Sequence, residues 1–352
     1  MKQKNAYLEL LRFIFCVLIC LYHWGKGHFR GAYVGVQFFF VLSGFMLAKR
    51  YFDNLVALRK QNIYENCLSF LKTRIIKYYP HFIFSLIVLS VIKVIILKLM
   101  TLNEFLKSLF WEITFLQNIG ITVSGDLINP PAWFLCAVVI CGYVIFFLLQ
   151  KYQDAYVYII APLSVIFMFC YFNQRFGSMA AASPVILFTT SGIIQGFACM
   201  SLGCMSYVFC MYLEQKLSKD NIVFRIIQSI AEIDLLGLIL LLCYKEGRTN
   251  KDFILIVFFA VLIISAALNN SLMSMVCNNY IRKVSLFCGR LSYPVFLNHM
   301  AVIICFNRFD DAGGGYAGQT VIFLLTTIIY SVITEKIVMW LLSAVKKISI
   351  FD

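Results

Sequence analysis

The chain of 352 residues is 61% hydrophobic, whereas soluble domains are roughly 45–50% apolar. This composition excludes an ordinary soluble protein and predicts an integral membrane protein. Its 30 lysines and arginines outnumber 17 acidic residues, but no nucleic-acid-binding motif accompanies the net charge of +13. Basic cytoplasmic loops therefore explain the charge better than a nucleic-acid partner does.

About ten stretches are long and apolar enough to cross a bilayer, which takes about 20 residues of helix. In chain order they are 6–24, 33–50, 75–97, 132–150, 156–172, 186–212, 226–244, 253–270, 289–307 and 319–344. Residues 105–119 are amphipathic, as is typical of a helix at the membrane interface. Without internal repeats, the sequence predicts a single all-α polytopic membrane domain over 1–352.

The distribution of basic residues predicts the orientation. If the N-terminus is cytoplasmic, the cytoplasmic loops carry most of the lysines and arginines, and segment 51–78 is the most basic of them. Positively charged loops stay on the cytoplasmic side of a membrane. We therefore expect both termini in the cytoplasm. The N-terminal stretch lacks a small-x-small cleavage site, which favours an uncleaved first span over a signal peptide.

An arginine opens the first span and a histidine closes it. From Arg12 to His23 is eleven residues, which returns a helix to within about 20° of the same face after a rise of about 16 Å. One stripe thus offers an anion-binding cation near the inner surface and a titratable imidazole toward the outer half. The structural alternative is that Arg12 reaches the inner headgroups and His23 lies at the interface beside Trp24.

The second span begins with the stretch GVQFFFVLSGF, residues 35–45. Gln37 and Gly44 share a helix face there. The pair Ser43-Gly44 allows close helix packing or a kink. Ordinary packing of small residues explains this stretch equally well.

The third span begins with Arg74-Ile-Ile-Lys77 ahead of Pro80. The two cations lie on one helix face, three residues apart. An arginine offers a bidentate fork to a phosphate and a lysine offers a point charge, so the pair is a candidate phosphate clamp. The excess of positive charge on the cytoplasmic side is the structural alternative.

Two later segments carry aromatic and titratable side chains. Trp133 begins the fourth span after two prolines and is typical of an aromatic anchor at the membrane surface. Tyr293 and His299 lie in the ninth span, six residues apart and on different faces.

The last span contains a carboxylate, Glu335, next to Lys336. A carboxylate inside a membrane is a functional candidate by default. Pairing of Glu335 with Lys336 or Arg12 is the structural alternative.

Together these motifs resemble acyltransferase family 3, the bacterial integral-membrane O-acyltransferases that also have animal relatives. The motifs are, in order, Arg12-x10-His23, the stretch 35–45, and Arg74-x-x-Lys77 before Pro80. The segments containing Trp133, Tyr293, His299 and Glu335 fit the family pattern more loosely. The resemblance extends over nearly the whole chain.

The resemblance implies roles for these residues. His23 matches the essential catalytic histidine, and Arg12, Arg74 and Lys77 match positions associated with the acyl-CoA donor. Lysine at 77 departs from the Arg-x-x-Arg pair of the family and lacks the bidentate fork. The residues expected to line or support a passage for the acyl group are Gln37, Ser43, Trp133, Tyr293, His299 and Glu335.

The implied enzyme is a multi-pass O-acyltransferase of the bacterial cytoplasmic (inner) membrane, which transfers groups other than amino-acyl groups. It would move an acyl group, in the commonest case acetyl, from cytoplasmic acyl-CoA to a hydroxyl of a cell-surface or lipid-linked glycan. His23 would serve as general base or as acyl carrier. Acyl-CoA is then a co-substrate, with membrane lipids as surroundings. No permanent cofactor or metal is expected, since no Cys-x-x-Cys motif occurs. The absence of a Gly-Asp-Ser block indicates the stand-alone form, without an SGNH-type domain.

Two other classes of protein compete with this interpretation. A transporter or flippase for polysaccharide precursors would show repeated halves with broken helices in matching positions, and neither is evident. A non-catalytic membrane scaffold is disfavoured because Arg12, His23 and the second-span motif are intact.

Overall fold

The computed structural model describes residues 4–25, 28–120, 127–180, 184–186, 189–217, 222–245, 247–309 and 316–348. Its helices are α1 (Ala6–Trp24), α2 (Gly35–Asp53), α3 (Leu55–Leu58), α4 (Ile63–Ser90), α5 (Leu102–Ile113), α6 (Trp133–Ala155), α7 (Ala161–Phe176), α8 (Ser191–Lys216), α9 (Ile222–Lys245), α10 (Lys251–Leu268), α11 (Leu272–Met275), α12 (Arg282–Phe309) and α13 (Tyr316–Ile348). Five shorter helical turns are Ala32–Val34, Val91–Ile96, Pro130–Ala132, Tyr156–Ile160 and Val276–Tyr280. Strands β1 (Val185–Ile186) and β2 (Thr189–Thr190) pair antiparallel. The predicted all-α membrane fold is confirmed.

Eight helical stretches within the described residues are long and apolar enough to cross a membrane. One of them, Pro130–Phe176, has 47 residues and contains both α6 and α7, so it covers two predicted spans. The predicted span 289–307 lies inside α12, a long helix that is not among the eight. Its polar residues, including Asn298 and His299, lower its hydropathy. All ten predicted stretches therefore fall mainly in long helices, and the orientation stays a prediction.

The helices α2 and α8 pack with backbone touching backbone. A Cβ atom at Gly44 would lie 1.9 Å from the carbonyl oxygen of Met200, and one at Gly203 would lie 2.0 Å from that of Val41. Only glycine fits at either position. The small-residue packing considered for the second-span motif is thus its structural role.

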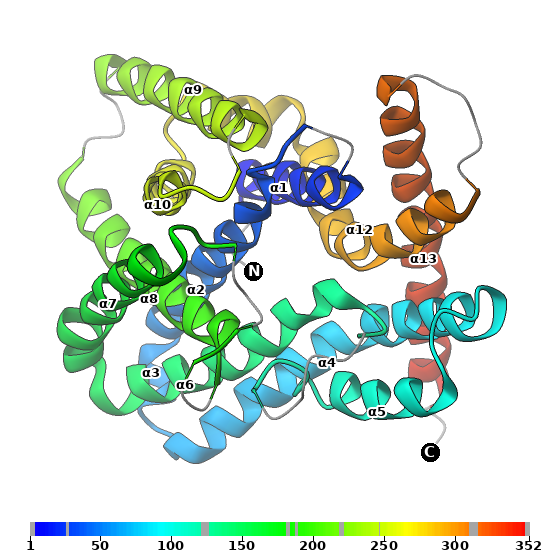
Figure 1. Cartoon of the computed structure of the whole chain (residues 1–352). Helices are drawn as coiled ribbons and strands as arrows, with labels where there is room; N and C mark the ends of the chain where they lie inside the picture. The colour runs from blue at the N-terminus through cyan, green and yellow to red at the C-terminus, as the bar shows by residue number, and fades with distance from the viewer. Residues whose placement is uncertain are drawn as a thin grey trace.

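The helices α1, α4 and α12 run in the same direction, side by side. Hydrogen bonds join Cys16 Sγ to Ser292 O (3.0 Å), Tyr293 Oη to Tyr78 O (2.9 Å) and Ser85 Oγ to Leu297 O (3.1 Å). Residue numbers rise together from Tyr78 and Tyr293 to Ser85 and Leu297, so α4 and α12 are parallel. They also rise together from Glu9 and Gly289 to His23 and His299, so α1 and α12 are parallel. In Figure 1 α1 lies near the centre, with α7 to α10 on its left and α12 and α13 on its right.

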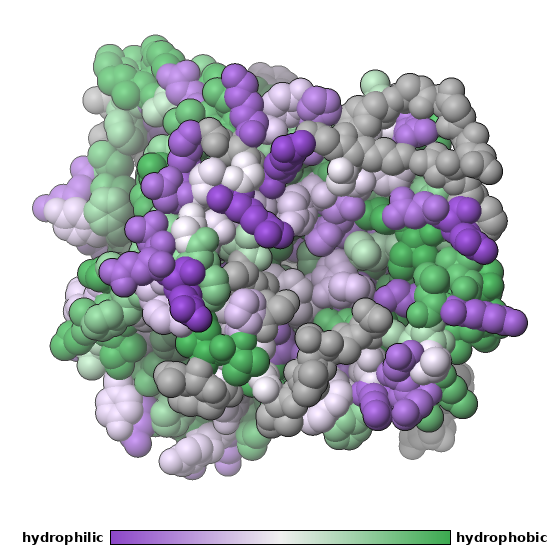
Figure 2. All heavy atoms as spheres, in the orientation of Figure 1, coloured by the Kyte–Doolittle hydropathy of each residue, from purple (hydrophilic) through white to green (hydrophobic). Residues whose placement is uncertain are grey.

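The outer surface fits a chain surrounded by lipid. Figure 2 shows hydrophobic side chains at the upper left, over α9, and along the right edge, while hydrophilic side chains cross the middle. Exposed apolar residues recur along α9 and α13; they include Ile222, Ile226, Ile230, Ile233, Val321, Leu325, Ile329 and Ile333. Water would not stabilise such helices, whereas lipid would.

The amphipathic helix predicted at 105–119 is α5, which begins earlier and ends sooner. Thr101 and Glu104 form a capping box at its start. Phe115, with φ +54°, lies in the left-handed region just beyond its end. The apolar side chains of Leu106 and Phe110 are exposed, as expected of a helix lying against lipid.

Candidate active site

His23 lies in the last turn of α1, which ends at Gly25 with φ +72°. Its side chain is exposed, so a substrate can reach the imidazole. The ring centroid lies 5.1 Å from that of His299 on α12 and 5.1 Å from that of Tyr22. The structure therefore brings together two histidines that are 276 residues apart in sequence.

His299 is fully buried, and its backbone neighbours fix its ring. The nitrogen Nδ1 lies 2.7 Å from the carbonyl oxygen of Phe296. A carbonyl can only accept, so Nδ1 is assigned the proton and Nε2 a lone pair. Within the described part of the chain, Nε2 has no hydrogen-bond partner.

The basic residues predicted to bind the donor gather near the other end of α1. Lys77 lies within electrostatic range of Arg12 and Arg74, whose charges repel it, and of one acidic side chain, Glu9, which attracts it. Arg74 donates to the hydroxyl of Tyr78 (3.2 Å), and its guanidinium lies over the Phe70 ring at 5.1 Å. The three predicted cations thus form one electropositive cluster between α1 and α4.

Arg12 also has an acidic neighbour that the sequence analysis did not single out. Its Nη1 lies 2.8 Å from Glu9 Oε2, one helical turn earlier. Glu9 packs against Gly289 on α12, where a Cβ atom would lie 2.2 Å from Glu9 Oε2. The i, i+3 spacing of Glu9 and Arg12 was the available signal.

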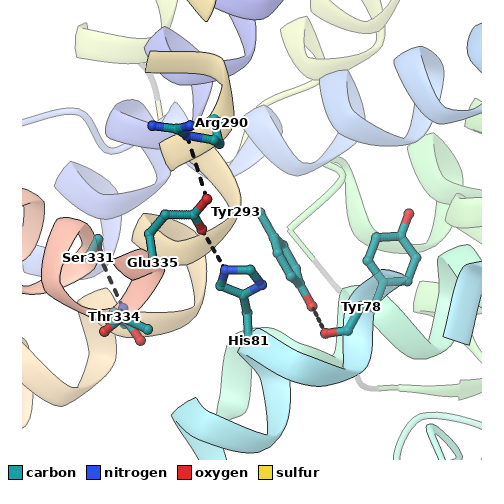
Figure 3. A network of polar contacts seen from close by, with 8 residues as sticks. Tyr78, His81, Arg290, Tyr293, Ser331, Thr334 and Glu335 are labelled. Carbon is teal, nitrogen blue, oxygen red and sulfur yellow. Dashed lines mark hydrogen bonds and ion pairs between the residues drawn. The ribbon is translucent and has the colours of Figure 1, made fainter. Parts of the chain in front are cut away.

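Glu335 on α13 binds residues from two other helices. His81 Nε2 lies 2.6 Å from Glu335 Oε2, and Arg290 Nε lies 3.5 Å from Oε1 (Figure 3). The alternatives considered from sequence, Lys336 and Arg12, are not its ion-pair partners within the described residues. This contact links the start of the α4 span to α12 and α13.

His81 continues a polar stripe along α4 that the sequence already contained. Arg74, Tyr78, His81 and Ser85 recur at intervals of four, three and four residues, which places them on one helix face. This face meets α12, where Tyr293 donates to the backbone of Tyr78 (Figure 3). Arg290, by contrast, gave no signal beyond its positive charge.

The remaining predicted residues belong to the packing of α2, α6 and α8. Gln37 is 2% exposed and donates to Gln195 on α8 at 2.8 Å. Ser43 is half-buried and precedes the close contact at Gly44. Trp133 is half-buried, 5.9 Å from the Phe40 ring.

This arrangement gives α1 two chemically different ends. A cluster of cations that suits phosphates lies about 16 Å along the helix from an accessible imidazole that suits proton or acyl transfer. Tyr78 and Tyr293 lie between α4 and α12, the neighbouring walls. No group of three His, Cys, Asp or Glu side chains in the described ranges could hold a metal ion.

The sequence matches the family model described as an acyltransferase domain over residues 5–336, nearly its whole length. The chain belongs to acyltransferase family 3. It is therefore a multi-pass membrane acyltransferase. No curated protein and no solved structure matches this acyltransferase significantly.

Proposed function

We propose that this acyltransferase moves an acyl group, acetyl in the first instance, from cytoplasmic acyl-CoA to a hydroxyl of a lipid-linked or surface glycan. The enzyme would act in a bacterial cytoplasmic membrane. One observation carries the proposal: the cation cluster of Arg12, Arg74 and Lys77 and the accessible His23 lie toward opposite ends of one helix.

In this proposal the cation cluster binds the acyl-CoA donor. Arg12, Arg74 and Lys77 hold phosphate oxygens of the CoA, with Arg74 oriented by Tyr78 and Phe70. The pantetheine arm then extends along the stripe of α1, a distance comparable to the rise of about 16 Å from Arg12 to His23. The thioester thereby arrives next to the imidazole.

Two routes of transfer fit His23. As a general base, neutral His23 takes the proton of the acceptor hydroxyl while its oxygen attacks the thioester carbon, and the CoA thiolate leaves and is then protonated. As a nucleophile, His23 attacks the thioester carbon first and releases CoA. The hydroxyl oxygen then attacks the acyl carbon, the C–N bond to the imidazole breaks, and the hydroxyl proton ends on the released CoA thiolate, which regenerates neutral His23.

The test is acyl transfer by protein reconstituted in liposomes with labelled acetyl-CoA and a glycolipid extract. His23→Ala should lower transfer at least about 100-fold. His28→Ala is the matched control, because His28 stacks on Tyr244, outside the site. Wild-type transfer by His23→Ala would refute the catalytic role, and glycolipid translocation without donor would favour a transporter.

An exchange assay separates the two routes. Labelled free CoA is mixed with unlabelled acetyl-CoA and enzyme, without any acceptor. Label appears in acetyl-CoA only if the enzyme reversibly keeps the acetyl group, which is the nucleophilic route. Absence of exchange from an enzyme that transfers acetyl to glycolipid assigns His23 as the base.

A further inference from the structure

The side chain of His299 contains an unused acceptor next to the proposed catalytic ring. Its Nδ1 proton is committed to Phe296 O, and its buried Nε2 has no partner in the described residues. An unpaired polar atom in such a place destabilises the folded chain, because it has lost its hydrogen bond to water. A buried acceptor without a partner therefore needs an explanation. The titratable ring next to His299 is that of His23, and the two ring centroids are 5.1 Å apart.

We propose that His299 is the positioning residue of His23: its Nε2 accepts a hydrogen bond from one ring N–H of His23. This bond selects one tautomer and turns the other, unprotonated nitrogen of His23 toward the substrate. The inference rests on the proposed catalytic role of His23. It extends that role by naming the group that orients the imidazole, as an acceptor orients the base in a catalytic triad.

The surroundings fix His299 and leave His23 free to adjust. Leu297 O, two residues earlier, accepts from both Ser85 Oγ and Asn129 Nδ2. Asn298 donates to Ser331 and Thr334 on α13. The turn of α12 that bears His299 is thus held from three sides.

His23 lies in the last turn before Gly25, and its side chain is exposed. The two rings are tilted by 37°. The hydrogen bond would form by rotation of the His23 side chain and not of His299, because the buried ring of His299 is fixed by its bond to Phe296 O.

Two substitutions separate the acceptor from the rest of the side chain. His299→Asn places an amide N–H where Nδ1 was and keeps the bond to Phe296 O, but it leaves no acceptor at the Nε2 position. His299→Gln reaches further and places its amide oxygen near the Nε2 position. The asparagine variant therefore removes only the acceptor at the Nε2 position, and the glutamine variant restores an acceptor there.

We expect His299→Asn to lower kcat at least about 10- to 100-fold, the range found when orienting partners of metal-bound histidines are removed. The KM for acetyl-CoA should stay the same, because the cation cluster is untouched. His299→Gln should recover most of the lost kcat. Equal activity of wild type and His299→Asn, or a loss in both variants alike, would overturn the positioning role.

A spectroscopic measurement tests the bond without using activity. The chain has four histidines, so nitrogen-15 spectra of histidine-labelled protein contain few signals, which single substitutions assign. Wild-type His23 should show one neutral tautomer, and His299→Asn should show a mixture. A mixture already in the wild type would refute the inference even if His23→Ala is inactive. Activity in His23→Ala would refute the proposed function instead.

Discussion

At the scale of single residues, some charged side chains of this acyltransferase could be placed from the sequence and others could not. Arg12 and His23 share a stripe because helix geometry places residues eleven apart on one face, so sequence suffices. Glu335, by contrast, pairs with His81 and Arg290, which lie on two other helices. No spacing within α13 predicts these partners. Their contact depends on how α4, α12 and α13 pack.

Arg74 provides a prediction at this scale. Arg74→Ala should raise the KM for acetyl-CoA about 10- to 100-fold with a smaller change in kcat, because a charged hydrogen bond to phosphate contributes about 1.5–3 kcal/mol. Lys72→Ala is the control, since Lys72 is an exposed cation two residues earlier on α4. Steady-state kinetics over a range of acetyl-CoA concentrations measures both. An unchanged KM in Arg74→Ala would remove Arg74 from the donor site.

At the scale of elements, composition was enough to predict which segments form helices. Where two helices touch was indicated by a few small residues only. The motif Ser43-Gly44 predicted close packing, and α8 is the partner that sequence could not name. The start of α5 was missed although Thr101 and Glu104 have the spacing of a capping box, which the sequence contains. Its end was missed because the left-handed backbone at Phe115 gives no signal in amphipathic spacing. Glu112 on α5 was also missed, because its hydrogen-bond partners are the backbone N–H groups of Ile128 and Asn129, which have no side-chain signal in the sequence.

Gly44 makes the α2–α8 contact testable. Gly44→Ala should destabilise the protein by about 1–3 kcal/mol, because the new methyl group would overlap Met200 O and push the helices apart. Gly237→Ala on α9 is the matched control, since no atom lies within 4 Å of its added Cβ and alanine favours helix. Thermal unfolding in detergent can be followed with a thiol-reactive dye, because most of the cysteines are buried and free. Equal midpoints for the two variants would contradict the close contact.

Glu112 gives the α5 junction a dependence on pH. Its carboxylate accepts from the backbone N–H groups of Ile128 (2.5 Å) and Asn129 (3.0 Å). Burial raises its pKa from 4.5 to about 7, although these donors and Lys93 act in the opposite direction. The helix α5 is not among the candidate spans. Because the folded chain keeps this proton to a higher pH than the unfolded chain, unfolding releases it, and stability falls as pH rises from about 4.5 to 7.

The expected contribution of Glu112 to this loss is on the order of 1–3 kcal/mol. Glu112→Gln cannot titrate, so the unfolding midpoint should vary less over this pH range in the variant. Glu65→Gln, an exposed change on α4, is the control. A slope in Glu112→Gln identical to the wild type would refute the assignment.

At the scale of the whole molecule, hydropathy was enough to predict an all-α polytopic chain, because every backbone group in a bilayer must be paired within its own helix. The same measure misses α12 as a candidate span, since Asn298, His299 and Arg290 make it polar. The helix that hydropathy undervalues is the one that carries residues of the site. Its place beside α1 and α4 follows from packing over the full chain, which a scan of separate windows does not contain.

The parallel packing of α1 against α12 has a consequence for biosynthesis. The ribosome makes α1 first and α12 nearly last, so His23 meets His299 only after almost the entire chain has been inserted. The ion pair of Arg12 can form much earlier, because its partner Glu9 lies one turn away in the same helix. We expect this pair to form as soon as α1 is helical and to offset the charge of Arg12 while α1 waits in the membrane. The proposed donor-binding end of α1 can thus be neutralised early, whereas the proposed catalytic end becomes complete only when assembly ends.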